Sequence, residues 1–461
     1  MIPLSLAAIA QITGAAPGPG TDTAAVAGSV VIDSRRAGPG ALFAALPGER
    51  ADGHDFAAAA VGRGAVAVLA SRPVGVPALI TPDVPGALAA LARAVAAAVP
   101  GLTIAGITGS MGKTTAKDLA AQLIERLGPT VAPHGSFNNE IGHPLTVLRV
   151  TGETRYLVLE LSARKAGDIA ALCAIAPPRI GAVLCVGHAH TGEFGGLAAI
   201  ARAKGELPAA LPPDGVALLN ADDPLVLAMA DRTAARVVTF GVHERATVRA
   251  DRVTLGSDGR PSFTLVTPAG TAIVKLRLLG AHNVVNALAA AALAGELGLP
   301  VAAVADGLSA ATALSRWRME VTERPDGVTV LNDAYNASPE AVAAALETLA
   351  AVARGRRAFA VLGAMNELGE ESERRHEEAG ALAARAGVAG LIVVGEAAAP
   401  MLAGAKAEPS WHGELIGVPD AGSAVIALGN LLAPGDVVLV KASRTIGLER
   451  VALALTGEAA Q

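Results

Sequence analysis

The chain has 461 residues, more than one ordinary hydrophobic core accommodates, so we expect about three domains. Hydrophobic residues make up 52% of the sequence but aromatic residues only 2%, so Ala, Val, Leu and Ile must fill the cores. The formal net charge is −5 and the charged residues are dispersed along the chain, which argues against electrostatic capture of nucleic acid.

The sequence favours a cytoplasmic protein. No run of about 20 strongly apolar residues is free of charge, so we expect no membrane insertion. The apolar segment 1–16 lacks the basic residues that open a secretory signal, and we interpret it as a short amphipathic helix capped near Ser5. The only cysteines are Cys173 and Cys185, so no disulfide framework is indicated and a reducing compartment fits.

The N-terminal hundred residues predict a small α/β domain. Short aliphatic runs alternate there with helical patterns, which is typical of strands and helices packed in layers. The predicted strands are 30–33, 41–46 and 65–69, and the predicted helices are 56–62 and 85–99. Pro100-Gly101 interrupts the pattern before a new strand, so we place the first domain at 1–99.

A second domain is predicted at 100–311. Its strands are continuous aliphatic runs, which indicates a parallel sheet covered on both faces. They lie at 102–107, 156–161, 180–186, 216–220 and 237–240. A β-rich segment at 247–279, with a turn at 257–259, follows, and a helix at 283–297 is expected to close the domain.

The remaining residues, 312–461, predict a second doubly wound, Rossmann-like α/β domain. Its strands are expected at 328–331, 359–362, 390–394 and 436–440, each followed by a helical pattern. We therefore predict an α/β protein of three domains, in which the central one is a parallel-sheet, nucleotide-binding domain.

A phosphate-binding loop is the most informative motif. A strand runs into a Gly-rich loop and then into a helix, the required context. Glycines let backbone N–H groups approach phosphates, while Lys113 offers a charge to the β/γ-phosphates and the Thr114 hydroxyl can bind Mg²⁺. By itself the loop indicates only a nucleoside triphosphate, so kinases and other ATPases stay open. The loop residues are Thr108, Gly109, Ser110, Met111, Gly112, Lys113, Thr114 and Thr115.

Two side chains follow neighbouring predicted strands and suit a divalent metal. Glu160 lies at the end of the strand at 156–161, and His190 comes after the strand at 180–186. Chemistry at a γ-phosphate needs a metal, and the carboxyl ends of parallel strands are where its ligands gather. A solitary Glu at a strand end is more often solvated or a capping residue, but the phosphate-binding loop upstream favours the metal role.

The loop's shorter form, Thr-Gly-x-x-Gly-Lys-Thr, resembles Mur ligases and folylpolyglutamate synthases. The resemblance to Mur ligases extends over essentially the whole chain. It implies ATP, two Mg²⁺ ions and a carbamylated Lys204 that acts as a carboxylate ligand beside Glu160 and His190. It also implies that Asn283 and Asn286 lie near adenine, although Asn283 could equally cap the helix that it begins. Arg318 and Asp333 complete the implied ATP site.

Further motifs match the family's substrate-binding segments. Asp33-Ser34-Arg35 resembles the part of the N-terminal domain that binds a uridine diphosphate, although an exposed turn would explain this motif equally well if it stood alone. The other residues that the resemblance assigns to substrate are Asn138, Asn139, Tyr335, Asn336, Asn366, Lys441, Ser443 and Arg444.

The Tyr335-Asn336-Ala337-x-Pro339 motif is closest to family members that use ATP to join D-alanyl-D-alanine to UDP-N-acetylmuramoyl-tripeptide through an acyl phosphate, in peptidoglycan precursor synthesis. This reaction and these substrates are what the resemblance implies for this chain. The alternatives are a tripeptide synthetase, a folylpolyglutamate-like enzyme and a non-catalytic nucleotide-binding paralogue. No sequence feature fixes the oligomeric state, and a monomer is our expectation.

Several positions depart from the family pattern. Cations stand at Arg164 and Lys165 where neutral groups are usual, and Trp317 replaces a glycine. Asn332 and Ala364 stand where acidic residues are usual. Arg164, Lys165 and Ala364 motivate the non-catalytic alternative, and the departures together leave room for a specialised or weakened paralogue.

Overall fold

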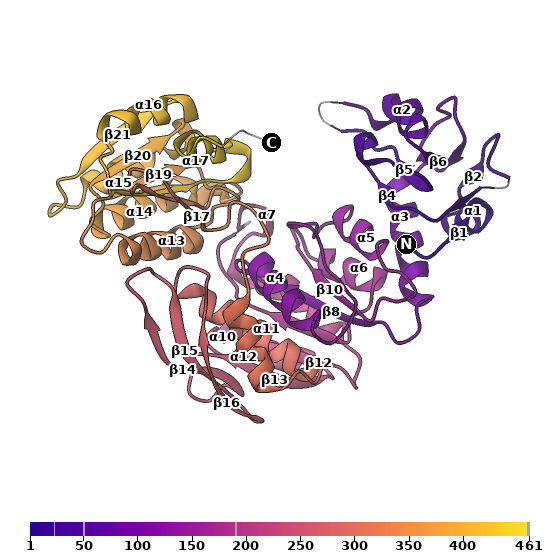
Figure 1. Ribbon diagram of the computed structural model, residues 1–461, viewed down its shortest axis with the longest axis horizontal. Coiled ribbons are helices and arrows are strands. Elements are labelled where there is room, and N and C mark those ends of the chain that lie inside the picture. The colour runs from indigo at the N-terminus through magenta and orange to yellow at the C-terminus, as the bar shows by residue number, and fades with distance from the viewer. Residues whose placement is uncertain (23, 49–50, 190, 459–461) are drawn as a thin grey trace.

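In the computed structural model, which describes residues 1–22, 24–48, 51–189 and 191–458, the chain forms three α/β domains, each built on its own sheet (Figure 1). This confirms the predicted fold class. The boundaries at 99/100 and 311/312 stay predictions.

The N-terminal domain has a five-stranded sheet in the order β2-β7-β6-β5-β4, parallel except for β2. A separate antiparallel pair joins β1 to β3. Helix α1 (Leu6–Thr13) confirms the predicted N-terminal helix, because the Ser5 side chain accepts a hydrogen bond from Ala8 N. The strands are β1 (Leu4–Ser5), β2 (Ala16–Pro17), β3 (Ala25–Val26), β4 (Val30–Val31), β5 (Ala41–Ala44), β6 (Ala65–Ala70) and β7 (Ala78–Ile80).

Helix α3 (Val84–Ala97) links the first two domains. Asp83 caps it by accepting a hydrogen bond from Gly86 N at 2.9 Å. Its apolar face, with Leu88 and Leu91 fully buried, packs against α1. It also contacts α5 (Gly142–Val147) and α6 (Asp168–Ile175) of the central domain. The other helical segments of the N-terminal domain are η1 (Ser34–Arg36), η2 (Gly53–Phe56) and α2 (Ala57–Gly62).

The central domain has a nine-stranded sheet in the order β16-β15-β14-β13-β12-β11-β8-β10-β9. Neighbouring strands from β9 to β14 in this order are parallel, whereas β15 runs antiparallel to its neighbours β14 and β16. The predicted β-rich segment is therefore an extension of the same sheet. The strands are β8 (Thr103–Thr108), β9 (Thr130–Val131), β10 (Tyr156–Glu160), β11 (Ile180–Val183), β12 (Val216–Asn220), β13 (Arg236–Gly241), β14 (Val248–Leu255), β15 (Pro261–Thr267) and β16 (Gly270–Lys275).

Helices α4 (Lys113–Ile124) and α11 (His282–Glu296) pack side by side on this sheet. Small buried side chains such as Ala116 and Ala290 allow close approach without aromatic residues. We expected the helix at 283–297 to close the domain, but a further helix follows α11. Pro300 interrupts the helical pattern, and α12 (Val301–Ala310) then packs on β16. The remaining helices are α7 (Thr191–Phe194), α8 (Leu197–Lys204), α9 (Glu206–Ala209), α10 (Pro224–Leu227) and η3 (Ala228–Arg232).

The C-terminal domain has a six-stranded sheet in the order β17-β18-β22-β19-β20-β21, parallel except for β17. The edge strands β17 and β21 were not predicted from the sequence. The strands are β17 (Glu320–Glu323), β18 (Thr329–Asn332), β19 (Ala358–Gly363), β20 (Gly390–Val394), β21 (Glu414–Val418) and β22 (Val437–Lys441). The helices are α13 (Pro339–Val352), η4 (Gly369–Glu371), α14 (Ser372–Arg385), η5 (Glu396–Ala398), α15 (Pro400–Lys406), α16 (Ala421–Leu431), η6 (Arg444–Ile446) and α17 (Glu449–Thr456).

The topology brings functional segments to one edge of the central sheet. Strands β11, β8 and β10 are adjacent and parallel, so their carboxyl ends meet there. The C-terminal domain contacts the same edge, where His188 Nδ1 lies 2.6 Å from Glu340 Oε1 and Gly192 N donates to Glu367 O at 3.0 Å. Three segments far apart in sequence therefore converge on the space beyond β8.

Both cysteines are free thiols, as the sequence indicated. Over the described residues, every helix is too short or too polar to cross a lipid bilayer.

The buried alanine-rich core predicts a large effect for the loss of a single Leu. Leu288 on α11 is fully buried, so Leu288→Ala should lower the free energy of unfolding by about 2–5 kcal/mol through lost burial and an unfilled cavity. Leu227→Ala is the control. Leu227 is 41% exposed, so this substitution should change the free energy of unfolding by less than about 0.5 kcal/mol. Chemical denaturation of both variants checks this, and equal midpoints would contradict the packing described.

Candidate functional site

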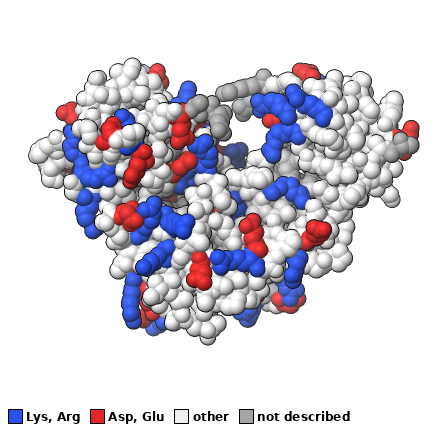
Figure 2. Space-filling view, viewed as in Figure 1, with Lys and Arg blue, Asp and Glu red and all other residues white. Residues whose placement is uncertain are grey.

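A cavity of about 1440 Å³ lies where the three domains meet. Its walls come from α3 of the N-terminal domain, from the carboxyl edge of the central sheet and from loops of the C-terminal domain. In Figure 2, Lys and Arg side chains lie on both sides of the hollow between the N- and C-terminal domains. A large cleft with basic walls suits an anionic ligand.

The predicted phosphate-binding loop lines this cavity. Gly112 has φ 79, a left-handed conformation that favours glycine, and α4 begins at the next residue. A Cβ at Gly112 would lie 2.2 Å from Asn286 Oδ1, so only glycine fits between the loop and α11. The loop residues that line the cavity are Ser110, Met111, Gly112, Lys113, Thr114 and Thr115.

The segment that follows β11 fixes the phosphate-binding loop through hydrogen bonds. Ser110 N donates to Cys185 O at 2.9 Å, and Gly187 N donates to Ser110 Oγ at 2.8 Å. Met111 N lies 3.4 Å from Cys185 Sγ. Thr108 is buried and its hydroxyl donates to Leu161 O on the other side. This contact of Cys185 was not predicted, because Cys185 belongs to no recognisable sequence motif.

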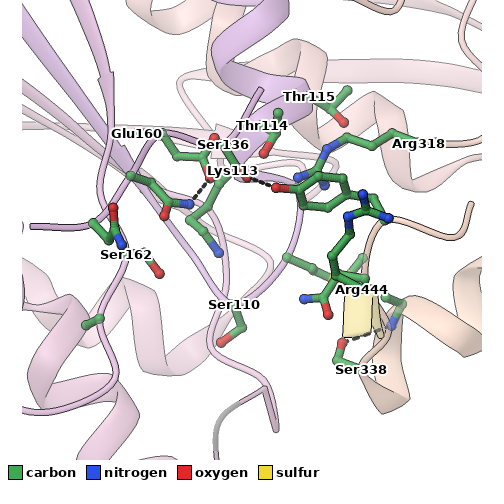
Figure 3. A pocket seen from close by; sticks show the side chains of 18 of the residues that line it. Ser110, Lys113, Thr114, Thr115, Ser136, Glu160, Ser162, Arg318, Ser338 and Arg444 are labelled. Carbon is green, nitrogen blue, oxygen red and sulfur yellow. Dashed lines mark hydrogen bonds between the residues drawn. The ribbon is translucent and has the colours of Figure 1, made fainter. Parts of the chain in front are cut away.

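Lys113 extends along the loop that it follows, and its Nζ donates to Gly109 O at 2.8 Å. Burial lowers the pKa of the Lys113 ammonium, while the charge of Glu160 opposes that shift. The half-buried Lys113 at the start of α4 and the buried Glu160 at the end of β10 therefore influence each other electrostatically. Figure 3 shows both side chains at the cavity, together with Thr114.

Glu160 has one oxygen engaged and one without a partner. Its Oε1 accepts a hydrogen bond from Asn138 Nδ2 at 2.6 Å, whereas Oε2 is buried and has no partner among the described residues. Glu160 itself is 1% exposed yet lines the cavity. An unpaired, buried carboxylate oxygen is costly, and a cation bound beside Thr114 would satisfy it.

The other predicted metal ligands are placed differently. Lys204, at the end of α8, is 5% exposed and does not line the cavity, and its side-chain ammonium makes no hydrogen bond or ion pair with another described residue. Burial, with the nearby charge of Lys113, lowers the pKa of Lys204 to about 7. His190 lies outside the described residues. Over the described part of the chain, no three His, Cys, Asp or Glu side chains are close enough to hold a metal.

Asn283 and Asn286 are buried on the first turns of α11 and line the cavity. Asn283 Nδ2 donates to Leu279 O at 2.7 Å, and its Oδ1 accepts from Asn286 Nδ2 at 2.8 Å. The alternative role of Asn283 as a helix cap is wrong. The N-cap position is Ala281, and Asn283 lies inside the first turn, where its side chain reaches back toward the preceding loop.

Arg318 and Tyr335 bring the C-terminal domain to the cavity. The guanidinium of Arg318 stacks 4.2 Å from the Tyr335 ring centre, and its Nε is buried without a partner among the described residues. The Tyr335 hydroxyl forms a short hydrogen bond with Ser136 of the central domain (Figure 3). This contact links the C-terminal domain to the loop that carries Asn138.

Lys441 is 2% exposed and is held by Asp333 and Asn336. Its Nζ donates to Asp333 Oδ2 at 2.6 Å and to Asn336 O at 2.8 Å. Asp333 Oδ1 also accepts from Met319 N at 3.1 Å, so this carboxylate fixes two segments of the cavity wall.

Asn366, Ser443 and Arg444 form the adjoining part of the wall. Asn366 N donates to Ser443 Oγ at 2.9 Å, so Ser443 supports the neighbouring loop. The Arg444 guanidinium lies 4.2 Å from the Trp317 ring centre and pairs with Glu449 at 2.8 Å.

Three residues that were predicted to bind substrate, Asn139, Ser34 and Arg35, contact protein groups or lie outside the cavity. Asn139 lines the cavity, but its Oδ1 accepts from Gly142 N at 2.9 Å. Ser34 is buried and Arg35 is 82% exposed, with its Nη2 2.8 Å from Asp33 Oδ2. Neither Ser34 nor Arg35 lines the cavity. The predicted nucleotide-binding residues and the predicted C-terminal substrate residues thus line one cavity, whereas Ser34 and Arg35 lie outside it.

Three family models match the chain: the Mur ligase family catalytic domain at 28–105, the Mur ligase middle domain at 107–294 and the Mur ligase glutamate ligase domain at 317–444. A UDP-N-acetylmuramoyl-tripeptide--D-alanyl-D-alanine ligase from Mycobacterium leprae is 48% identical, covering 100% of this chain and 99% of that protein. A crystal structure of MurF from Acinetobacter baumannii matches with a TM-score of 0.87 and 29% identity over 99% of both chains. MurF from Thermotoga maritima in complex with ADP matches with a TM-score of 0.79 and 31% identity, covering 93% of this chain and 97% of that one.

The crowding at Gly112 predicts that a methyl group there blocks nucleotide binding. Gly112→Ala places Cβ against Asn286 and forces φ away from 79, so affinity for ATP should fall roughly a hundredfold. Gly101→Ala is the matched control, because Gly101 also has positive φ but open space around it. Titration calorimetry with ATP on both variants separates the effect of backbone strain, which they share, from the collision with Asn286, which only Gly112→Ala introduces. Equal losses in the two variants would contradict the role of close packing.

Proposed function

Because this chain belongs to the Mur ligase family, we propose that it uses ATP to join D-alanyl-D-alanine to UDP-N-acetylmuramoyl-tripeptide in peptidoglycan precursor synthesis. The observation that carries this proposal is the likeness along the whole chain to ligases named for that reaction. The cavity supports it, because a nucleotide loop and basic groups of a second domain face the same space.

The first step is transfer of the γ-phosphoryl group. A carboxylate oxygen of the tripeptide attacks the γ-phosphorus, the bond to the β,γ-bridging oxygen breaks, and ADP leaves with that electron pair. The product is an acyl phosphate. In our proposal Lys113 contacts the β- and γ-phosphates, and Arg318 adds a second positive charge from the opposite wall of the cavity.

Thr114 and the unpartnered Oε2 of Glu160 fit a hard cation, and we propose that they hold Mg²⁺. When bound, Mg²⁺ neutralises negative charge on the phosphate oxygens. Asn138 fixes the orientation of the Glu160 carboxylate by donating to its other oxygen. His190 and Lys204 complete the proposed set for two ions.

We propose that Lys204 is carbamylated. The neutral amine attacks CO₂ and loses a proton, which gives a carbamate with one negative charge. The lowered pKa of Lys204, about 7, populates the neutral amine near neutral pH. The modification also replaces a buried cation, which has no hydrogen-bond partner among the described residues, by a group able to bind metal.

In the second step the neutral amine of D-alanyl-D-alanine attacks the acyl carbon. The tetrahedral intermediate expels phosphate, and the amine releases a proton as the amide forms. Water would hydrolyse the acyl phosphate, so the cavity must be closed during this step. The contacts of Tyr335 with Ser136 and of His188 with Glu340 join the central and C-terminal domains around it.

The remaining residues are proposed to bind substrates. Asp33 engages Nε and Nη2 of Arg35, which leaves Nη1 for a diphosphate oxygen of the uridine nucleotide, beside Ser34. Asn283 and Asn286 are assigned to the adenine side and Asp333 to the ATP site. Asn138, Asn139, Tyr335, Asn336, Asn366, Lys441, Ser443 and Arg444 are assigned to the peptide substrates. We expect a cytoplasmic monomer.

Phosphate release tests the proposed reaction. The purified protein with ATP and Mg²⁺ should release phosphate only when UDP-N-acetylmuramoyl-tripeptide and D-alanyl-D-alanine are both present. Mass spectrometry should detect the pentapeptide product, and omission of Mg²⁺ should abolish turnover. Binding of ATP without turnover on any peptide acceptor would instead identify a non-catalytic nucleotide-binding protein.

The carbamate has its own test. Lys204→Ala should lower kcat by at least about a hundredfold, because one of the proposed Mg²⁺ ligands is lost. Short-chain carboxylates should restore part of the activity in this variant. Lys406→Ala, which alters an exposed lysine of the C-terminal domain outside the cavity, should behave as the wild type. Loss of activity in Lys204→Ala with no carboxylate rescue would argue against carbamylation.

A further inference from the structure

Two cations in the cavity wall have no part in the proposed reaction steps. Arg164 and Lys165 follow β10 directly, lie four and five positions after Glu160 and line the cavity. Five extended residues span at most about 17 Å, which limits how far both residues can lie from Glu160 along this cavity. Arg93 of α3 lines the same cavity from the N-terminal domain.

The loop that carries these cations has a fixed backbone. Ser162 N donates to Asn138 O at 3.0 Å, which ties the loop to the residue that orients Glu160. Asp168 Oδ2 accepts from Arg164 N at 2.9 Å and from Lys165 N at 3.0 Å. Figure 3 shows Ser162 at the cavity beside Glu160. The backbone of Arg164 and Lys165 is thus held, while both residues line the cavity.

The positive charge is only weakly compensated. Lys165 makes no ion pair with a described residue, and Arg164 has one contact at 3.8 Å, to Glu367 of the C-terminal domain. Asp168 adds a negative charge nearby, but its oxygen binds backbone N–H groups of the loop. Glu206, the next acidic side chain at this loop, accepts from Gly167 N and Ala170 N in the same way. The loop therefore presents charged donors to whatever occupies the cavity.

The reaction determines what lies opposite this loop. The tripeptide's third residue supplies the carboxylate that is phosphorylated, so its side chain is the part of the peptide nearest to Glu160 and to the loop. We propose that Arg164 and Lys165 bind a second carboxylate on that side chain, so that the substrate's third residue is of the 2,6-diaminopimelate type rather than lysine. This inference rests on the proposed function.

The chemistry separates the two substrates. A lysine side chain ends in an ammonium group, which two cations repel. A 2,6-diaminopimelate side chain ends in an amine and a carboxylate, and the carboxylate accepts charge-assisted hydrogen bonds from Arg and Lys. The free carboxylate of the peptide's second residue and the diphosphate are common to both substrates, so neither produces a preference between them.

Steady-state kinetics with both tripeptides tests the inference. The wild type should favour the diaminopimelate substrate, and Lys165→Ala and the double variant Arg164→Ala/Lys165→Ala should raise its KM about tenfold with little change in kcat. The KM for the lysine substrate should stay constant or fall. Lys165→Glu should reverse the preference, because a carboxylate attracts the lysine ammonium. Lys275→Ala, an exposed cation of the same domain outside the cavity, is the matched control.

The outcomes are distinct. Equal KM increases for both tripeptides would place the two cations against a shared part of the substrate and overturn the proposal, as would unchanged KM in every variant. Failure of the proposed function looks different, because wild-type protein would then release no phosphate with either tripeptide in the presence of D-alanyl-D-alanine.

Discussion

The site depends on one electrostatic pairing, between the half-buried Lys113 at the start of α4 and the buried Glu160 at the end of β10. Burial disfavours the charged form of the Lys113 ammonium, while the Glu160 charge favours it. Glu160 keeps one oxygen without a partner among the described residues, and Asn138 holds the other. A highly charged ligand with a cation would complete this arrangement. The parallel order β11-β8-β10 is what brings the phosphate-binding loop and this carboxylate to one edge.

The C-terminal domain contributes cations that are positioned within that domain. Asp333 holds Lys441, and Tyr335 stacks under Arg318, so both cations keep their places through contacts inside the domain. Polar contacts also cross the domain boundary, such as Tyr335 to Ser136 and His188 to Glu340. Rigid domains joined by polar contacts can separate to admit substrates and close again, while the cavity-lining side chains of each domain keep their positions.

The sequence predicted those features that arise from local patterns. The strand 390–394 and the strand 216–220 agree with β20 and β12, because continuous aliphatic runs mark buried parallel strands. Glycines and a lysine between a strand and a helix identified the phosphate-binding loop. The edge strand β17 was not predicted, because it is mostly exposed and lacks an aliphatic run. The Cys185 contact with the loop also escaped prediction, since it depends on which strands become neighbours.

Trp317 shows how tertiary contacts explain a residue that departs from a family pattern. Its φ is 60, in the left-handed region that glycine adopts readily and in which other residues are strained by about 1 kcal/mol or more. Its backbone N donates to Glu320 and its carbonyl accepts from Tyr335 N, so the turn is held from both sides. The indole ring stacks on Arg444 at 4.2 Å, a contact that glycine cannot make. The cation–π contact with Arg444 counteracts the backbone strain at Trp317 and positions a cation at the cavity wall.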